Sequence, residues 1–434
     1  YGLRPAGPRV RAAALVAPPD DDAPLTRAHW VQMGLLALAL VIDVMKAGSL
    51  GFVAPGMRVE YGIPGSTVAM LPLVALTGTT IGSFVWGALA DYYGRRASLL
   101  LAAVMFVGTS ICGAMPSFAW NVVMCFVMGL AAGGMLPVAN ALLAEIMPRR
   151  HRGWSLVLVG GIGTVGGYFA ASAASALLQP VFGWRVMWLI GCPTGVLLIA
   201  LSPLIPESAR FLLAMGRTEE ARETFARFGT VIGDTATATP PAGSRPSRNV
   251  MSAGLLSTGV ALTLAAFTWG CVNYGVLLWL PAALVAEGRS VGVASAVIAR
   301  SALIAIPAIL VATYLYSAWS TKRALVVAIG ITTLGLVATL LRGSGVSGLS
   351  SPLVPVTLLV VGTSWVISYL LPYTTESFPV LWRGRATGWM AGASKAGGVL
   401  AQVLAALALV PGLGLADRKS TRLNFSHVSE SSMP

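Results

Sequence analysis

The chain has 434 residues, of which 56% are hydrophobic and only 10% are charged, and its formal net charge is +13 at pH 7. An ordinary soluble domain carries about 25% charged residues, so the composition excludes that class. The apolar residues come in blocks long enough to cross about 30 Å of hydrocarbon as helices. The sequence therefore predicts an all-α multi-pass membrane protein.

Hydropathy predicts eleven membrane spans in chain order, six before a polar break and five after it. The spans cover approximately residues 30–54, 66–90, 97–116, 118–146, 153–178, 184–205, 251–286, 292–318, 324–341, 351–376 and 387–416. We divide the chain accordingly into a leader, an N-terminal half, a cytoplasmic inter-domain loop, a C-terminal half and a tail, at residues 1–28, 29–205, 206–250, 251–416 and 417–434.

Lys and Arg residues are distributed unevenly over the predicted loops. With the N-terminus inside, the inner loops hold nineteen of them and the outer loops hold four. Because cytoplasmic loops carry the excess of positive charge, we expect a cytoplasmic N-terminus and a bacterial inner (plasma) membrane location. The positive net charge then reflects topology and contact with anionic lipid, so nucleic acid is not an expected partner.

Both ends of the chain depart from this pattern. Residues 1–28 lack an initial Met and are rich in Pro, Ala and Arg, which is typical of a disordered leader or a truncated start. The tail begins DRKSTRLNFSH and resembles the in-frame translation of a common sequencing adapter. Eleven spans would also place its basic residues outside, against the charge rule. We expect residues 417–434 to be an assembly artefact that replaced a twelfth helix.

An internal repeat relates the two halves. The pattern E-x-x-P-x-x-x-R-G follows the fourth span, from Glu145 to Gly153, and follows the tenth span, from Glu376 to Gly384. Such repeats indicate a duplicated transporter fold, with six helices expected in each half.

Two further loops carry a family resemblance. GALADYYGRRASLL, after the second span, resembles the G-x-L-A-D-x-x-G-R-R/K loop of the major facilitator superfamily. PESARFLLAMGRTEEAR, after the sixth span, resembles a signature of sugar porters and their organic-ion relatives. The resemblance covers roughly residues 30–416, and it implies two pseudo-symmetric six-helix halves that transport by alternating access.

These loops supply candidate gating residues. Alternating access needs a cytoplasmic lock between the halves that is strong enough to bias two states and weak enough to break. Acids placed against the local positive charge, at Asp91, Glu145 and Glu376, suit that role, whereas the loop arginines by themselves fit ordinary positive-inside loops with weak ion pairs. The gating candidates are Gly87, Asp91, Gly94, Arg95, Arg96, Glu145, Arg152, Glu207, Arg210, Glu376 and Arg383.

The first span contains an acid and a base three residues apart, Asp43 and Lys46. They could form a self-satisfied ion pair on one helix. Ionisable groups inside a membrane nevertheless mark transport pathways by default. Proton-coupled members of the resembling families carry an acid at this depth, so we expect Asp43 to exchange a proton and Lys46 to hold it ionised until substrate competes.

The other intramembrane charges are the cations Arg300 and Lys395. Three cations against one acid favour an anionic substrate, most simply a carboxylate, although Arg300 could instead extend to the membrane surface. Aromatic and polar residues in two spans could frame an organic ligand, or else belong to the packing. The proton and substrate candidates are therefore Asp43, Lys46, Arg300, Lys395, Trp269, Asn273, Tyr274, Trp365 and Tyr369.

The absence of certain motifs narrows the range of functions that the sequence is expected to have. The seventh span lacks the paired glutamines of hexose porters, and Cys125 stands where aromatic-acid:proton symporters usually carry an Arg. There is no phosphate-binding loop, and the three histidines lie outside the predicted spans, so we expect no enzyme activity, no metal and no cofactor besides a proton gradient. The sequence predicts a monomeric proton-coupled symporter of a small organic anion. A proton-driven exporter, or a transport-inactive sensor on the same scaffold, is the alternative.

Overall fold

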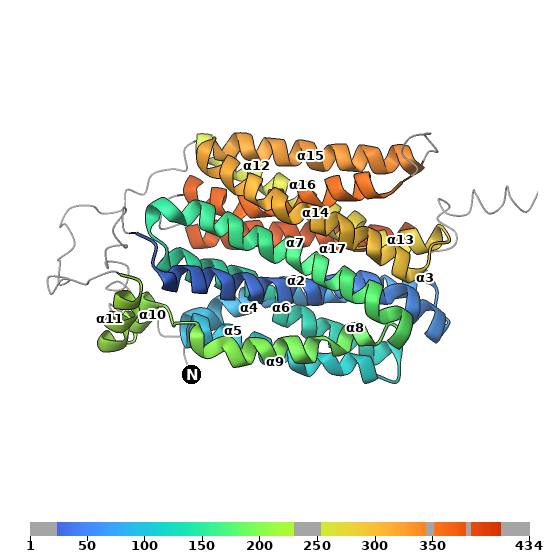
Figure 1. The fold of residues 1–434 in the computed structure, drawn as a ribbon, viewed down its shortest axis with the longest axis horizontal. Helices are drawn as coiled ribbons and strands as arrows, with labels where there is room; N and C mark the ends of the chain where they lie inside the picture. Colours follow the sequence, from blue (N-terminus) through green and yellow to red (C-terminus); the bar gives the residue numbers. More distant parts are fainter. Residues whose placement is uncertain (1–23, 230–252, 344–350, 379–382, 409–434) are drawn as a thin grey trace, which may run out of the picture.

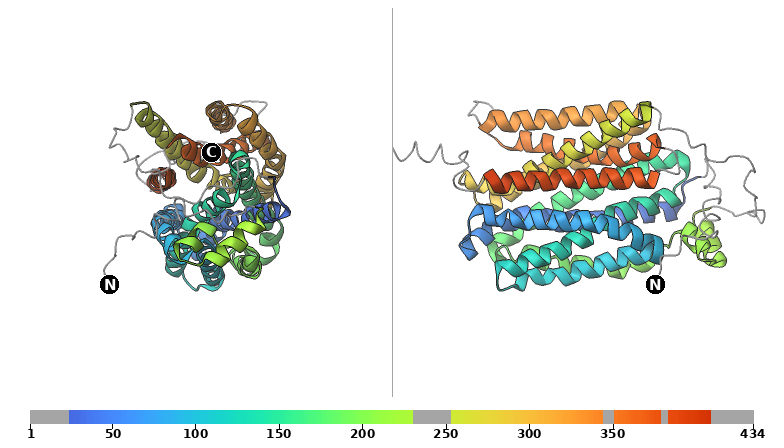
Figure 2. Two further views of the ribbon diagram at one scale, coloured as in Figure 1. Left: turned by 90° about the vertical axis from the view of Figure 1, so that its left-hand side faces the viewer. Right: turned by 180° about the vertical axis from the view of Figure 1, so that it is seen from behind.

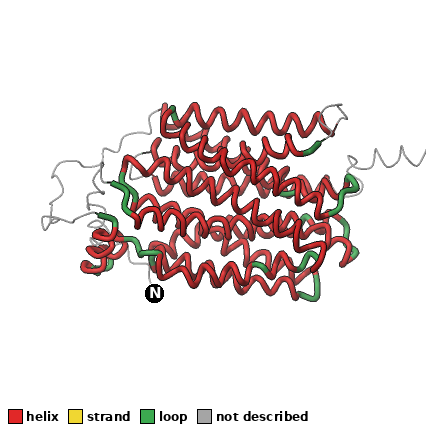
Figure 3. Tube along the Cα trace, viewed as in Figure 1, coloured by secondary structure: helices red, strands yellow, loops and turns green. Residues whose placement is uncertain are grey.

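A computed structural model describes residues 24–229, 253–343, 351–378 and 383–408. Within these ranges every regular element is a helix (Figure 3). The long helices lie side by side along one axis, and the short helices α10 and α11 lie beyond one end of the bundle (Figure 1). We call that end the α11 end and the opposite one the far end. The predicted leader, the second part of the inter-domain loop and the tail 417–434 fall largely or wholly outside the described residues.

The helices divide at the gap in the middle of the chain. The N-terminal half comprises α2 (Arg27–Tyr61), α3 (Gly65–Val68), α4 (Met70–Tyr93), α5 (Arg95–Thr109), η1 (Ser110–Ala114), α6 (Phe118–Ile146), α7 (Arg149–Phe182), α8 (Val186–Leu189), α9 (Gly191–Leu201) and η2 (Ser202–Leu204), followed by α10 (Ala209–Ala214) and α11 (Thr218–Arg227). The C-terminal half comprises α12 (Ala253–Gly270), η3 (Cys271–Leu277), α13 (Leu280–Ala286), α14 (Val291–Ala318), α15 (Thr321–Gly343), α16 (Leu353–Ser377) and α17 (Arg383–Ala408).

Eleven stretches of the described chain are long and apolar enough to cross a membrane, and each overlaps one predicted span. The predicted fold class is confirmed. Boundaries differ by a few residues, most clearly in the first span, which extends from Arg27 to Tyr61. The physical reason is that hydropathy detects the part of a helix in hydrocarbon, whereas the hydrogen-bonded helix continues into the interface.

The two halves lie against each other along the bundle axis, as the end-on view shows (Figure 2). Helix α7 of the N-terminal half packs on α14 and α16, and α4 packs on α17. A hydrogen bond of 2.7 Å between the hydroxyls of Ser175 and Ser295 joins α7 to α14. These contacts place α4 and α7 of one half against α14, α16 and α17 of the other.

Glycines set the close approach of α4 and α6. A Cβ atom at Gly78 or Gly82 would collide with backbone of α6, and one at Gly129 or Gly133 would collide with backbone of α4. Small residues one turn apart let membrane helices approach backbone to backbone, and dispersion contacts then stabilise the pair. The same approach brings side chains of α4 within reach of α6 carbonyl oxygens.

Helix α11 is amphipathic, as its sequence predicts. Ala221 and Phe225 are buried, while the first turn carries two glutamates that favour a helix N-terminus. The ring of Phe228, which follows α11, lies 5.0 Å from that of His29 at the start of α2. The polypeptide after the sixth span is therefore anchored on the N-terminal half.

Candidate functional site

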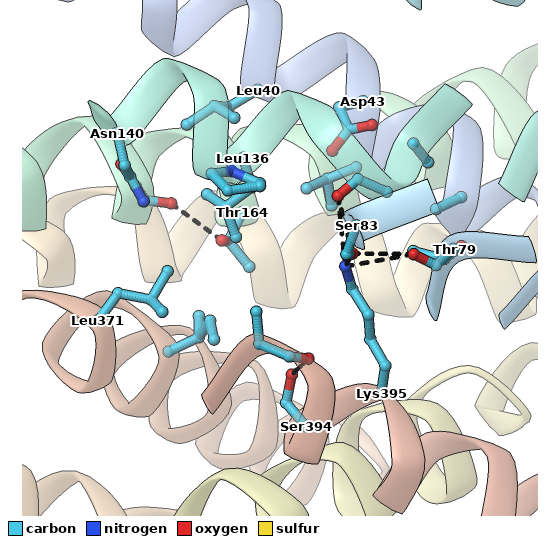
Figure 4. Close-up of a pocket in the computed structure, with 18 of the residues that line it drawn as sticks. Leu40, Asp43, Thr79, Ser83, Leu136, Asn140, Thr164, Leu371, Ser394 and Lys395 are labelled. Atoms are coloured by element: carbon cyan, nitrogen blue, oxygen red, sulfur yellow. Dashed lines mark hydrogen bonds between the residues drawn. The ribbon is translucent and has the colours of Figure 1, made fainter. Parts of the chain in front are cut away.

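A cavity of about 470 Å³ lies between the two halves. Residues from α2, α4, α6 and α7 line one side of it, and residues from α12, η3, α16 and α17 line the other (Figure 4). Most of the lining is apolar. Among the lining residues there is one carboxylate, Asp43, and one ammonium group, Lys395.

Asp43 belongs to α2 and is 7% exposed. Its Oδ1 atom is buried and has no hydrogen-bond partner among the described residues. No described ion pair includes Asp43. A buried carboxylate oxygen without a partner is costly when charged, so the chemistry open to this side chain is to take up a proton or to accept a hydrogen bond from a ligand.

Lys395 extends from α17 to the opposite half of the protein (Figure 4). Its Nζ donates to the Ser83 hydroxyl, and it lies 3.4 Å from the carbonyl oxygen of Gly133 and 3.5 Å from that of Thr79. The Gly133 carbonyl is free because Pro137, four residues later in α6, has no N–H to donate. The Ser83 hydroxyl lies 2.9 Å from this carbonyl oxygen and 2.9 Å from that of Thr79, so its one proton can be donated to either.

Helix α12 opens into a π-helical segment, η3, as it reaches the cavity. Asn273 and Tyr274 of this segment line the cavity, as does Trp269 just before it. The Tyr168 hydroxyl of α7 donates to Asn273 Oδ1 at 2.9 Å, which is a hydrogen bond between the two halves. π-helical turns often occur at functional sites because the extra residue displaces side chains and frees backbone groups.

Gln402 of α17 binds this irregular segment. Its Nε2 donates to the carbonyl oxygen of Tyr274, and its Oε1 accepts the indole N–H of Trp279 at 2.9 Å. The side chain is completely buried. One turn earlier on α17, Gly398 leaves room for the Tyr274 ring. Helix α17 therefore positions both Lys395 and the tyrosine across from it.

Lys46 does not pair with Asp43. Its Nζ donates to the Ser110 hydroxyl at 3.2 Å and to the Trp188 carbonyl at 3.3 Å, and it lies 5.7 Å from the centre of the Trp188 ring. A buried ammonium needs acceptors for its N–H groups, and η1 and α8 supply them within the N-terminal half. Lys46 is not among the residues that line the cavity.

Three other predicted ligand residues also lie elsewhere. Trp365 and Tyr369 are buried in α16 with their rings 6.3 Å apart, and the Tyr369 hydroxyl donates to the Ala312 carbonyl of α14. The side chain of Arg300 is exposed on α14. None of the three is part of the cavity lining, because each faces another side of its helix.

At the α11 end, Glu207 caps helix α5. Its Oε1 accepts the backbone N–H of Arg95 at 2.6 Å, and its Oε2 accepts that of Arg96 at 3.2 Å. A carboxylate here satisfies unpaired N–H groups and the helix dipole. Gly94 makes the contact possible, since it has a φ of +103° and a Cβ atom would collide with the Glu207 carboxylate.

The two glutamates of the internal repeat lie in different surroundings. Glu145 accepts from the Ser208 hydroxyl and forms an ion pair of 3.6 Å with Arg95. Glu376 accepts from the Tyr316 hydroxyl at 2.5 Å and from Thr321 at 3.2 Å. A Cβ atom on Gly153, at the end of the first repeat, would lie 3.4 Å from Glu376 Oε1.

Of the other gating candidates, Arg152 donates to the Met147 carbonyl at 3.3 Å. The surroundings of Gly87 and the side chains of Asp91, Arg210 and Arg383 are outside the described part of the structure.

Sequence reasoning did not identify several residues of the cavity. The residues that it missed are Thr79, Ser83, Asn140, Tyr168 and Gln402, the last of which supports the cavity wall from α17. One signal was available in the sequence, because Pro137 inside a span implies a free carbonyl at Gly133 that needs a donor. The donor itself, from α4 or α17, follows only from the packing.

Comparison with known proteins gives the family. A model described as Major Facilitator Superfamily matches residues 36–402. The chain is 25% identical to the niacin transporter NiaP of Acinetobacter baylyi over 404 residues, covering 88% of each chain. It is 26% identical to a gallate transporter of Pseudomonas putida, covering 91% of this chain and 89% of that one. It is 30% identical to the 4-hydroxybenzoate transporter PcaK of Pseudomonas putida over 287 residues, covering 62% of each.

Solved structures show the same fold. The proton:xylose symporter XylE, bound to 6-bromo-6-deoxy-D-glucose, matches with a TM-score of 0.64 and 19% identity, covering 89% of this chain and 96% of that one. The inward-open conformation of XylE from E. coli matches with a TM-score of 0.67 and 17% identity, covering 87% and 90%. Because the family model matches residues 36–402, this chain belongs to the major facilitator superfamily and is a multi-pass membrane transporter.

Proposed function

We propose that this chain is a proton-coupled symporter that takes up a small organic monocarboxylate across the bacterial inner membrane. The observation that carries the proposal is the pair of ionisable groups in the cavity, the Asp43 carboxylate and the Lys395 ammonium. They come from opposite halves of the protein, so both can respond when the halves move.

Charge balance explains how these two groups would couple proton to substrate. With Asp43 ionised and Lys395 protonated, the empty cavity is neutral. If one carboxylate anion and one proton enter, the proton neutralises Asp43 and the anion balances Lys395, so the loaded cavity is neutral too. Adding only one of them leaves a net charge in a low-dielectric cavity, which is unfavourable. The empty and the fully loaded states are therefore the two that can reorient across the membrane.

Lys395 is suited to bind the substrate carboxylate. Its contacts to the carbonyl oxygens of Thr79 and Gly133, at 3.5 and 3.4 Å, are longer than a normal hydrogen bond. A carboxylate would accept a shorter, charge-assisted bond from the same ammonium. The named relatives support this substrate class, because niacin, gallate and 4-hydroxybenzoate are all small organic acids.

The cavity also has a direction. At the far end, Gly51 of α2 lies directly against the backbone of Leu278, so the halves are in contact there. Toward the α11 end, the lining continues to Ala144, Thr375 and Thr387. If the charge rule places the α11 end in the cytoplasm, this arrangement corresponds to a substrate site that faces inward.

In this proposal the gate at the α11 end lies where the halves meet, at Glu376, and the other acids there brace the N-terminal half. Glu207 and Glu145 connect α5, α6 and the segment before α10, all within the N-terminal half. Glu376 belongs to the C-terminal half and meets Gly153 of α7. Motion of one half against the other would change the contact between Glu376 and Gly153. The network around Glu207 and Glu145 would move together with the N-terminal half.

The proposal is tested by recording external pH in lightly buffered cells that express the full chain, while benzoate, nicotinate or 4-hydroxybenzoate is added. We expect alkalinisation with at least one compound, absent in cells without the protein and absent with Asp43→Asn. Acidification would instead indicate proton-driven export. No response to any acid, with the protein present in the membrane, would contradict carboxylate symport.

A further inference from the structure

The face of α6 that lines the cavity has a polar group at each end and an apolar middle. Gly133, Leu136, Pro137 and Asn140 all line the cavity, at the i, i+3, i+4 and i+7 spacing of one helix face. The carbonyl of Gly133 marks the position of the Lys395 ammonium, 3.4 Å away. Asn140 is the next amide or hydroxyl side chain along this face.

The helix provides a length scale for the site. Seven residues of an α-helix rise about 10.5 Å along the axis. Gly133 and Asn140 are therefore two turns apart, with Asn140 nearer the α11 end. In Figure 4 the end of the Lys395 side chain and Asn140 lie on opposite sides of the view, with Leu136 between them.

The side chain of Asn140 is part of the cavity surface and has no described hydrogen bond. By contrast, the hydroxyl of Thr164, which also lines the cavity, is already used by the Gly160 carbonyl of its own helix at 2.9 Å. An amide offers both a donor and an acceptor. Asn140 can therefore bind either a hydroxyl group or a ring nitrogen of a ligand.

This spacing fits one kind of organic acid. A single aromatic ring with a carboxylate and a second polar atom opposite it spans roughly 6–7 Å between polar atoms, and a hydrogen bond of about 2.8 Å at each end makes the total comparable with the two-turn rise from Gly133 to Asn140. A short aliphatic acid would reach only one end. The apolar middle, with Leu136 on α6 and Leu371 on α16, would cover the faces of the ring.

We propose that Asn140 is a specificity-determining residue that binds the polar group at the end of the substrate opposite the carboxylate. The preferred substrate is then a single-ring aromatic monocarboxylate with a hydrogen-bonding group para or meta to the carboxylate. This inference rests on the proposed function, because it takes Lys395 as the carboxylate-binding group.

The test measures binding to the purified full chain by titration calorimetry. Three acids are compared: benzoate, 4-hydroxybenzoate and 4-methylbenzoate, the last of which has the length of the second but no hydrogen-bonding group. In the wild-type protein we expect 4-hydroxybenzoate to bind about tenfold more tightly than 4-methylbenzoate, the value of one hydrogen bond. Asn140→Leu should abolish this preference, and size-exclusion chromatography and the thermal unfolding midpoint of the purified variant check that it is folded.

Asn140→Ser, which keeps a donor and an acceptor, should retain part of the preference. Thr77→Val is the control, since Thr77 is exposed on α4 and its hydroxyl bonds only to Leu73 of its own helix. A preference for 4-hydroxybenzoate that persists in Asn140→Leu, or an equal loss of all three acids, would overturn the inference. Failure of the proposed function has a different signature, because wild-type protein would then bind none of the acids or would bind them equally after Lys395→Met.

Discussion

The ammonium of Lys395 lies 3.4 Å from the carbonyl oxygen of Gly133, a backbone acceptor that Pro137 leaves without an intrahelical donor. One proline in α6 thus leaves a backbone carbonyl that binds a charged side chain from the other half of the protein. The hydroxyl of Ser83 and the carbonyl oxygens of Thr79 and Gly133 stabilise this ammonium inside the membrane. The two carbonyl contacts are nevertheless long enough to be exchanged for a hydrogen bond to a carboxylate.

The Ser83 hydroxyl contacts both the Lys395 ammonium and the Gly133 carbonyl oxygen, so its removal should destabilise the protein. Ser83→Ala leaves Lys395 with only the two long carbonyl contacts and removes a hydroxyl donor that lies 2.9 Å from the carbonyl oxygens of both Thr79 and Gly133. We expect a loss of about 1–3 kcal/mol in the free energy of unfolding, measured by denaturant titration in detergent. The matched control is Thr77→Val, whose hydroxyl bonds only within α4. Equal stability of the two variants would contradict this role for Ser83.

Asp43→Asn should separate substrate exchange from proton-driven accumulation. The amide imitates the protonated acid, so the cavity that holds Lys395 and one substrate anion stays neutral and can reorient loaded. The empty cavity then keeps a net positive charge, which hinders its return. In proteoliposomes we expect counterflow of labelled substrate to persist while uptake driven by a pH gradient falls at least about tenfold. Loss of both activities in a folded variant would argue against this assignment.

Gln402→Leu should loosen the π-helical segment that carries Asn273 and Tyr274. The substitution removes the donor to the Tyr274 carbonyl and the acceptor for the Trp279 indole, two part-buried hydrogen bonds of a fully buried side chain. Unpaired buried groups cost about 1–3 kcal/mol each, so local opening should become more frequent. Hydrogen exchange of residues 271–279 should rise. Gln179→Leu is the control, because Gln179 makes a similar buried contact to the Phe52 carbonyl in the other half. In the Gln179→Leu variant, hydrogen exchange should rise only near Gln179 and Phe52.

Glu287 predicts a pH dependence of stability outside the membrane spans. Hydrogen bonds from Arg342 are the main cause that holds the pKa of the Glu287 carboxyl below its ordinary value of 4.5. A lowered pKa means that the pair contributes its stability above pH 4.5 and loses it as the pH falls through the folded-state pKa. Because Glu287 is 42% exposed, the effect should stay below about 1 kcal/mol.

The measurement is the unfolding midpoint of the purified protein between pH 6 and pH 3. Glu287→Gln should lower the midpoint at pH 6 and should reduce its dependence on pH below 4.5. A variant that follows the wild-type curve throughout would show that the pair contributes nothing.

The sequence by itself determined the class, the spans and the family motifs of this protein. Hydrophobic stretches must become helices in a bilayer, because the backbone has no other way to satisfy its hydrogen bonds there. Charged residues inside those stretches were visible for the same reason, which is why Asp43 and Lys395 could be named in advance. The acids of the loop motifs could be named from their pattern alone.

Only the tertiary structure decided which of these residues share a cavity. Asp43 and Lys46 are three residues apart in one helix, yet only Asp43 lines the cavity, while Lys395 from the last described helix lines it too. Helix rotation, the close approach that Gly133 permits and the carbonyl freed by Pro137 fix that result. These are contacts between distant segments, and the order of residues along one helix does not specify what its other faces will meet.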